Sequence, residues 1–281
     1  MSLEQVSQNH FTQKQYNIDV PVGKFPVVEV TPLQPKTDIP VVIAPGWSAS
    51  PSIFFNSQSL LALKGRRSLV FDHPRWGGKV EPNPDYFTAE VRKAVALLSV
   101  IEHSHSDKVD IIAHSEAGVY SVIAAMLQPE KFRNLVLVGP AGVVGHNTFP
   151  GLLGRMTNKV LRHLAQGISD ISTTITVIRA NTGSLVSIAK NPIRALSEGV
   201  AISKSDTTTM LEKLHAKGIG IVLIHHAGDE AMPMHLIQKA VKAHMLDGVL
   251  SVTGLHDDLY VYPDKYTAAA EEMLTALEKK G

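Results

Sequence analysis

Cysteine is absent from the 281-residue sequence, which excludes disulfide bonds, a cysteine nucleophile and any metal site built on thiolates. No run of about 18 apolar residues occurs, so we expect no transmembrane helix and no membrane insertion. The net charge is only +1, which gives the chain no electrostatic reason to bind nucleic acid or an anionic membrane. The N-terminal residues are polar and lack the apolar core of a signal peptide. Together these absences are typical of a cytoplasmic protein.

Nucleotide-binding and metal-binding patterns are also missing. No Gly-x-Gly-x-x-Gly follows a strand-like run, and no Gly-x-x-x-x-Gly-Lys-Ser/Thr occurs, so nucleotide binding has no support. His103 and His105 stand close together in a polar turn, but no carboxylate cluster completes a ligand set around them. The sequence therefore predicts neither a cofactor nor a metal ion, and a small-molecule substrate is the expected partner.

Apolar strand-like runs alternate with amphipathic helical patterns along most of the chain. This alternation predicts an α/β fold with a mostly parallel, eight-stranded sheet flanked by helices. The helical patterns include 86–102, 234–245 and 264–279. The predicted strands are 10–19, 25–31, 39–44, 68–72, 108–113, 135–139, 219–224 and 248–252.

The alternation stops between residues 143 and 217, where helical patterns at 152–164, 171–189, 192–202 and 207–214 follow one another without a strand. We expect residues 1–142 and 218–281 to form one core, with 143–217 inserted after the sixth strand as a helical cap. Such a cap would cover the carboxyl ends of the strands, where open α/β sheets bind ligands. The alternative is a small second domain with no link to that site. An apolar pattern at 175–185 also leaves a homodimer formed through this segment open.

The segment from Val109 to Gly118 carries the strongest functional signal. A short apolar run ends at Ser115, and an apolar helical pattern begins directly after it. Strand, sharp turn and helix in this order push a nucleophile into a strained backbone conformation and expose its oxygen. Small residues are needed two positions before and after the serine, because the chain doubles back there. Ala113 and Ala117 occupy those positions.

The turn Ala113-His114-Ser115-Glu116-Ala117-Gly118 is similar to the Ala-His-Ser-x-Gly turns of some bacterial lipases and esterases, with alanine in place of the usual glycine at 117. The chain resembles the cap-bearing serine hydrolase branch of the α/β-hydrolase superfamily, in which nucleophile, acid and histidine follow in this order. The resemblance covers nearly the whole chain and implies Ser115 as the nucleophile.

A serine hydroxyl needs a base to take its proton, and the base needs a carboxylate to orient it. The resemblance implies His256 as the base, since it follows the last strand-like run. It implies Asp229 as the acid, in a loop of the form Asp-x-x-x-Pro, with Glu230 as the second choice. His114 stands next to the serine, and strand alternation predicts that it points to the opposite face.

Attack on a carbonyl creates an oxyanion, which requires hydrogen-bond donors already in place. The resemblance implies the backbone N–H groups of Glu116 and Trp47, with Trp47 in a loop where Pro45 replaces the histidine of the superfamily's His-Gly-x sequence. Both side chains are also candidates for the substrate pocket. Instead of lining the pocket, the Trp47 side chain could pack in the core. The Glu116 side chain could instead cap the N-terminus of its own helix.

Three functions remain open on these residues. The first is hydrolysis of a carboxylic ester or related small acyl compound through an acyl-serine intermediate. The second is hydrolysis of a carbon–carbon bond with the same Ser-Asp-His triad, and the third is non-catalytic binding of a small ligand. A serine nucleophile argues against dehalogenase and epoxide hydrolase relatives, which use aspartate. Neither the substrate nor the acyl length can be deduced from the sequence.

Overall fold

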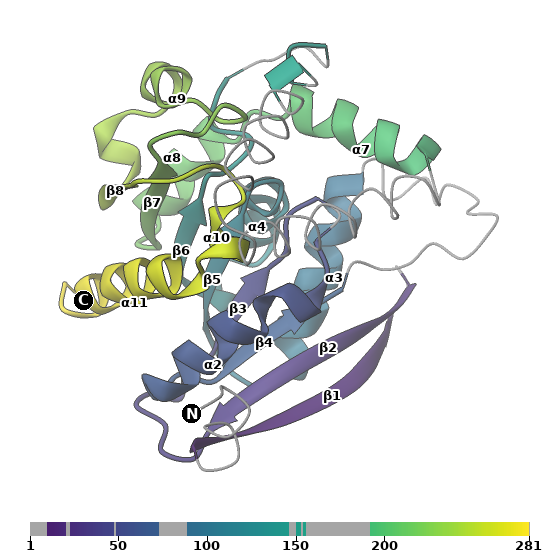
Figure 1. Cartoon of the computed structure of the whole chain (residues 1–281), viewed down its shortest axis with the longest axis vertical. Helices are drawn as coiled ribbons and strands as arrows, with labels where there is room; N and C mark the ends of the chain where they lie inside the picture. Colours follow the sequence, from purple (N-terminus) through teal and green to yellow (C-terminus); the bar gives the residue numbers. More distant parts are fainter. Residues whose placement is uncertain are drawn as a thin grey trace, which may run out of the picture.

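The computed structural model describes residues 10–20, 23–47, 49–72, 89–145, 150–152, 154–155 and 192–280. Within them lies one eight-stranded sheet with the order β1-β2-β4-β3-β5-β6-β7-β8 (Figure 1). β1–β2 and β2–β4 pair antiparallel, and every pair from β4–β3 to β7–β8 is parallel. The strands are β1 (Phe11–Val20), β2 (Gly23–Pro32), β3 (Val41–Ala44), β4 (Ser68–Phe71), β5 (Val109–His114), β6 (Phe132–Val138), β7 (Gly220–His226) and β8 (Gly248–Val252).

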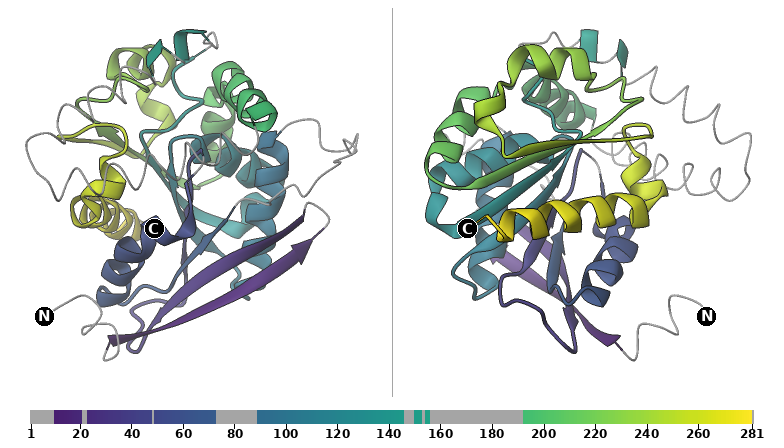
Figure 2. Two further views of the ribbon diagram at one scale, coloured as in Figure 1. Left: turned by 45° about the vertical axis from the view of Figure 1, so that its right-hand side comes forward. Right: turned by 90° about the vertical axis from the view of Figure 1, so that its left-hand side faces the viewer.

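Helices cover both faces of the sheet, as Figure 2 shows. One face is covered by α3 (Ala89–His103), α4 (Ala117–Leu127) and α8 (Thr208–Ala216), and the other by α2 (Phe55–Leu63) and α11 (Pro263–Glu278). This arrangement confirms the predicted fold class. The remaining helical elements are η1 (Pro51–Phe54), η2 (Pro129–Lys131), α7 (Pro192–Lys204), α9 (Met234–Ala240), η3 (Ala243–Met245) and α10 (Asp258–Val261).

The central strands are apolar along their whole length because both of their faces are buried. In β5, Ile111 and Ala113 belong to the core under α3, α4 and α8, whereas Ile112 belongs to the core under α2 and α11. In β6, Leu137 and Val138 divide between the two cores in the same way. Strands of a parallel sheet covered on both faces read as continuous hydrophobic runs, which is why these segments were recognisable in the sequence.

A buried arginine holds the C-terminal helix against the sheet. The side chain of Arg66, two residues before β4, has no exposed surface. It pairs with Glu271 and Glu278 of α11, and it lies 3.8 Å from Asp110 at the start of β5. Burying such a charge is tolerable only when it is fully paired. Helix α11 therefore has a fixed position, and so does the loop that precedes it.

The segment predicted as a cap is described only at its ends. Helices α7 and α8 match the helical patterns expected near 192–202 and 207–214. Helix α8 packs on α4. Most of the helices expected at 152–164 and 171–189, and the apolar pattern at 175–185, lie outside the described residues. The division into core and cap therefore stays a prediction, as does the homodimer.

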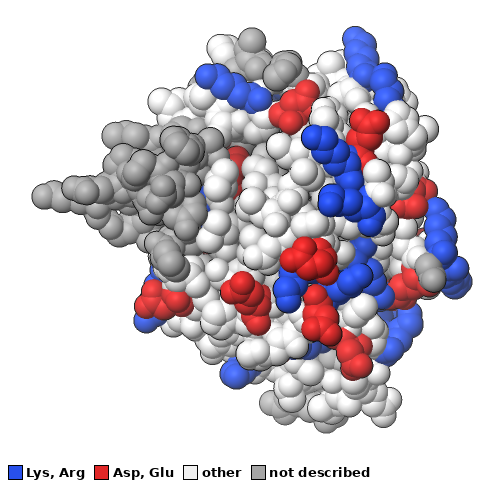
Figure 3. All heavy atoms as spheres, turned by 180° about the vertical axis from the view of Figure 1, so that it is seen from behind, with Lys and Arg blue, Asp and Glu red and all other residues white. Residues whose placement is uncertain are grey.

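The surface on the face opposite to that of Figure 1 carries charges of both signs. Lysine and arginine side chains stand among aspartate and glutamate side chains, without a broad area of one sign (Figure 3). This mixture is in keeping with the net charge of +1.

Candidate active site

The candidate site lies at the carboxyl ends of the parallel strands, where open α/β sheets bind ligands. Ser115 follows β5, Asp229 follows β7 and His256 follows β8. Nε2 of His256 lies 2.8 Å from Oγ of Ser115, and Nδ1 of His256 lies 2.7 Å from Oδ2 of Asp229. The structure thus brings together the three residues that the sequence proposed as a set. Glu230, the second choice of acid, does not take the place of Asp229 beside His256.

Ser115 adopts a backbone conformation that L-amino acids rarely take. Its φ is +56°, in the left-handed region, which costs a non-glycine residue about 1–2 kcal/mol. Hydrogen bonds hold the turn in place: the N–H of Ser115 donates to the carbonyl of Val138, and its carbonyl accepts from the N–H groups of Gly118 and Ala141. The sharp turn expected from the sequence is therefore fixed by the end of the neighbouring strand β6.

The alanine at position 117 fits because the tight contact falls one residue later. Ala117 is fully buried and makes its turn with a Cβ atom present. A Cβ atom on Gly118 would lie only 2.7 Å from Cβ of Pro140, closer than two such atoms approach in proteins. In this chain the requirement for glycine therefore lies at 118, which explains the departure from the usual motif.

The hydrogen bonds of His256 define which of its nitrogens carries a proton. An ionised carboxylate only accepts, so Nδ1–H of His256 donates to Asp229. Nε2 is then free to accept the hydroxyl proton of Ser115. The second oxygen of Asp229 accepts the backbone N–H of Met232 at 2.8 Å, which fixes the carboxylate. His256 is thereby held in the tautomer that can act as a base toward Ser115.

Asp229 stays ionised although it is buried. Burial alone would raise its pKa, but attraction to His256 and hydrogen bonds with His226 and His256 outweigh burial and hold the pKa well below its usual value. A permanently charged carboxylate at this position stabilises a positive charge on His256. That is the charge the ring would gain on accepting the proton of Ser115.

The loop after β3 lies directly over the serine turn. A Cβ atom on Gly46 would come within 3.0 Å of the carbonyl oxygen of His114 and 3.3 Å of Cβ of Ser115, so only glycine permits this approach. The hydroxyl of Tyr120 on α4 donates to the carbonyl of Pro45 at 2.7 Å and holds the start of the loop. Trp47 follows Gly46 in this loop, and its role as an oxyanion donor stays a prediction.

His114 lies beside the site, a contact that the sequence did not lead us to expect. Its ring centroid lies 5.0 Å from that of His256, and its Nε2 lies 2.9 Å from the carbonyl oxygen of His256. Strand alternation holds up to His114, which lies on the side of Ile112 and contacts Tyr260, a residue packed on the core under α2 and α11. The carbonyl of His256 also faces this side. A carbonyl only accepts, so Nε2 of His114 carries the proton, and Nδ1 accepts from the hydroxyl of Tyr260 at 2.6 Å. His114 therefore supports the backbone of His256.

Replacing His114 by glutamine is expected to reduce the acid sensitivity of the fold. Burial and the charge of His256 lower the pKa of His114 to about 3, whereas an unfolded histidine has a pKa of about 6.5. Below pH 6.5 the unfolded chain therefore binds a proton that the folded chain refuses, and stability falls as the pH falls. This one residue lowers the free energy of unfolding by about 2 kcal/mol between pH 7 and pH 5.

Denaturant unfolding of wild type and His114→Gln at pH 7 and pH 5 measures this difference. Glutamine can donate to His256 and accept from Tyr260, but it cannot titrate. On acidification, the free energy of unfolding of the variant is expected to fall by about 2 kcal/mol less than that of wild type. His235→Gln, which replaces an exposed histidine on α9, is the matched control. Equal losses in wild type and His114→Gln would contradict the assignment.

Glu116 and Trp47 have partners that the sequence did not suggest. The side chain of Glu116 is fully buried and makes no capping hydrogen bond to its own helix; it pairs instead with Lys93 of α3. Trp47 is half-buried against the core, and its indole N–H donates to Glu198 of α7 at 2.9 Å. A direct role of either side chain toward a substrate remains a prediction.

Two groups of side chains in the site have the composition of metal ligands. They are His226 with Asp229 and His256, and His114 with His256 and Asp257. Both groups share His256, and its two ring nitrogens already contact Asp229 and Ser115. We therefore interpret both groups as parts of one hydrogen-bonded site.

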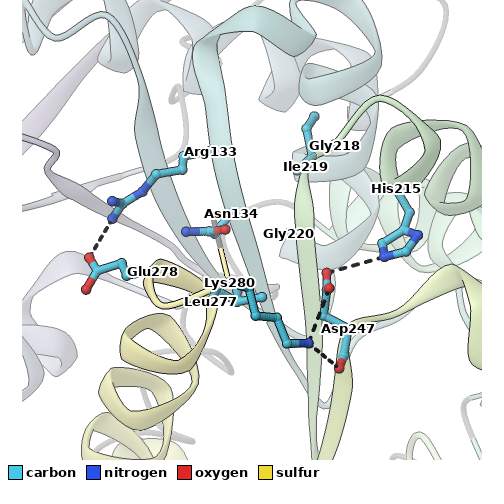
Figure 4. Close-up of a pocket in the computed structure, with 10 residues that line it drawn as sticks. All are labelled: Arg133, Asn134, His215, Gly218, Ile219, Gly220, Asp247, Leu277, Glu278 and Lys280. Atoms are coloured by element: carbon cyan, nitrogen blue, oxygen red, sulfur yellow. Dashed lines mark hydrogen bonds and ion pairs between the residues drawn. The ribbon is translucent and has the colours of Figure 1, made fainter.

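A hollow at the opposite end of the sheet is a separate feature. It measures about 370 Å³ and lies where β6 and β7 begin, beside the end of α11. Its charged side chains pair with one another: Asp247 contacts His215 and Lys280, and Arg133 contacts Glu278 (Figure 4). Because these charges are already paired within the hollow, we assign no ligand to it.

The family model of the alpha/beta hydrolase fold matches residues 39–170. None of the curated proteins matches the chain by sequence. Among solved structures, a hydrolase from Pseudomonas aeruginosa PA01 is similar with a TM-score of 0.66 and 14% identity, over 93% of this chain and 98% of that one. A structure from a study of carboxylesterases of Nitrososphaera gargenis is also similar, with a TM-score of 0.67 and 16% identity, over 95% of this chain and 100% of that one.

An N-formylmaleamic acid deformylase from Pseudomonas putida S16 is similar with a TM-score of 0.64 and 18% identity, over 92% of this chain and 100% of that one. At these identities the structures establish the fold. Together with the family model, they show that the chain has the α/β-hydrolase fold. In the part of the chain that the structure describes, no helix has the length and apolar character needed to span a bilayer.

Proposed function

We propose that the protein is a serine hydrolase that cleaves a carboxylic ester or a related small acyl compound through an acyl-Ser115 intermediate. The observation that carries the proposal is the continuous hydrogen-bonded chain from Ser115 through His256 to Asp229. The α/β-hydrolase fold supports a hydrolase, and carboxylesterases and a deformylase stand among the similar structures.

The reaction follows from the positions of these groups. His256 takes the hydroxyl proton of Ser115 as Oγ attacks the carbonyl carbon of the substrate. The backbone N–H groups of Glu116 and Trp47 would hold the oxyanion. His256 then gives its proton to the leaving alcohol, and the acyl group stays on Ser115. A water molecule, deprotonated by His256, attacks the acyl-enzyme, and His256 returns this proton to Oγ of Ser115 as the acid leaves.

The segment 143–217 is proposed to contribute a cap that selects the substrate. Its last part is described, and α7 of this segment reaches the candidate site through Glu198 and Trp47. A helical segment joined to the site in this way is well placed to close over the carboxyl ends of the strands.

A panel of p-nitrophenyl esters from acetyl to dodecanoyl tests the function directly. We expect turnover that depends on acyl length, because the wall of a closed pocket limits the chain it accepts. A dienoic diketone is included in the panel, since carbon–carbon bond hydrolysis uses the same three residues. Turnover of the diketone alone would replace ester cleavage by that reaction. If the protein neither turns over any compound of the panel nor reacts with a fluorophosphonate, the result supports non-catalytic binding of a small ligand instead.

A further inference from the structure

A buried lysine lies between two glutamates beside the candidate site. Nζ of Lys93, on α3, is 2.5 Å from Oε1 of Glu116 and 3.3 Å from Oε1 of Glu198. All three side chains are at least 95% buried. Glu116 directly follows Ser115, whereas Glu198 belongs to α7, which packs against α3. Lys93 thus joins the serine turn to α7, a helix in the C-terminal part of the segment 143–217.

The second oxygen of Glu198 extends this connection to the loop after β3. Oε2 of Glu198 accepts the indole N–H of Trp47 at 2.9 Å. The chain of contacts therefore runs from Glu116 through Lys93 and Glu198 to Trp47. Its two ends, Glu116 and Trp47, are the residues whose backbone N–H groups are proposed to hold the oxyanion.

Burial makes this network rigid. Burial tends to lower the pKa of Lys93, but the negative charges of Glu116, Glu90 and Glu198 outweigh it and raise the pKa, so Lys93 is an ammonium ion. Glu90 lies in the same cluster, and its pKa is raised well above the usual value by burial and by the charge of Glu116. Removing one partner from such a buried set leaves an uncompensated charge, so the members are held together.

We propose that Lys93 and Glu198 are positioning residues that fix the two halves of the oxyanion hole relative to each other. Lys93 holds the Glu116 side, and Glu198 holds the Trp47 side. The proposal rests on the proposed function, because it concerns the same intermediate. Gly46 brings the loop after β3 close to the serine turn, and the indole hydrogen bond to Glu198 holds the next residue, Trp47, on the side of α7.

A double-mutant cycle between Trp47 and Glu198 tests this positioning role. Trp47→Phe removes the indole N–H and keeps an aromatic ring, and Glu198→Leu removes the acceptor. We expect each variant to lower kcat for p-nitrophenyl acetate about 10-fold or more while KM changes less than about 3-fold, because the contact acts on the transition state. The double variant should be no slower than Glu198→Leu, since that variant already removes the hydrogen bond that Trp47→Phe removes.

Two controls separate positioning from general loss of structure. Glu212→Leu makes the same change at an exposed position of α8 and should keep the wild-type kcat. Thermal unfolding reports whether each variant is folded. Should Glu198→Leu fail to fold, Trp47→Phe carries the test, because it breaks the same hydrogen bond from the other side.

The outcomes distinguish this inference from the proposed function. Additive losses of kcat, or an unchanged kcat in Trp47→Phe, would overturn the positioning role while leaving a hydrolase. A wild-type protein that neither turns over the ester nor reacts with a fluorophosphonate would overturn both.

Discussion

Replacing Ser115 by alanine is expected to lower ester turnover by about 10⁵-fold. Without Oγ, His256 has no nucleophile to deprotonate, and no acyl-enzyme can form. The oxyanion donors remain and leave only a small residual acceleration. Initial rates with the best ester of the panel, compared with wild type at equal concentration, measure the loss.

Ser121→Ala is the matched control for this loss. Ser121 is a fully buried serine on α4, and its hydroxyl has no hydrogen-bond partner among the described residues. The control is expected to keep the activity of wild type. Ser115→Ala should remain folded, because the hydrogen bonds that hold the turn come from the backbone. Comparable activity in Ser115→Ala and wild type would remove Ser115 from the mechanism.

Replacing Asp229 by asparagine is expected to lower kcat by about 10⁴-fold with little change of shape. The amide of asparagine can donate to Nδ1 of His256, which then moves the ring proton to Nε2. Nε2 would face Ser115 as a donor and could not accept its proton. The variant also removes the negative charge that stabilises a protonated His256.

Measuring kcat of Asp229→Asn over a range of pH checks this explanation. The carboxylate of wild type stays ionised far into the acid range, so the defect of the variant should persist wherever wild type is active. Glu230→Gln makes the equivalent change at the adjacent residue and should retain most of the activity. A severe defect in Glu230→Gln with an active Asp229→Asn would transfer the role of the acid to Glu230.

The strands of the central sheet could be predicted from the sequence because both of their faces are buried. Segment 68–72 is a nearly uninterrupted apolar run, and it forms β4 with boundaries that agree within one residue. Segment 248–252 forms β8 with the predicted bounds, although this strand lies at the edge of the sheet and exposes alternate residues. Helix α2 was not predicted. Its apolar residues do not gather on one side, since it is buried along much of its surface, and no periodic pattern marks it.

The relative positions of Ser115, Asp229 and His256 could be anticipated because each follows a strand that ends at the same edge of the sheet. The network around Lys93 could not. A single sequence gives no sign that residues on α3, α4 and α7 meet. One local signal was available: Glu90 and Lys93 share a helix face with the buried residues Leu97 and Ile101, where a charged side chain needs a partner.

The central claim is that Ser115 becomes covalently acylated, and mass spectrometry of the fluorophosphonate-treated protein tests it most directly. The account predicts one adduct per chain, located by peptide mapping on Ser115, absent from Ser115→Ala and formed much more slowly in His256→Ala. An adduct on another residue, or ester turnover by a protein that forms no adduct at Ser115, would contradict it.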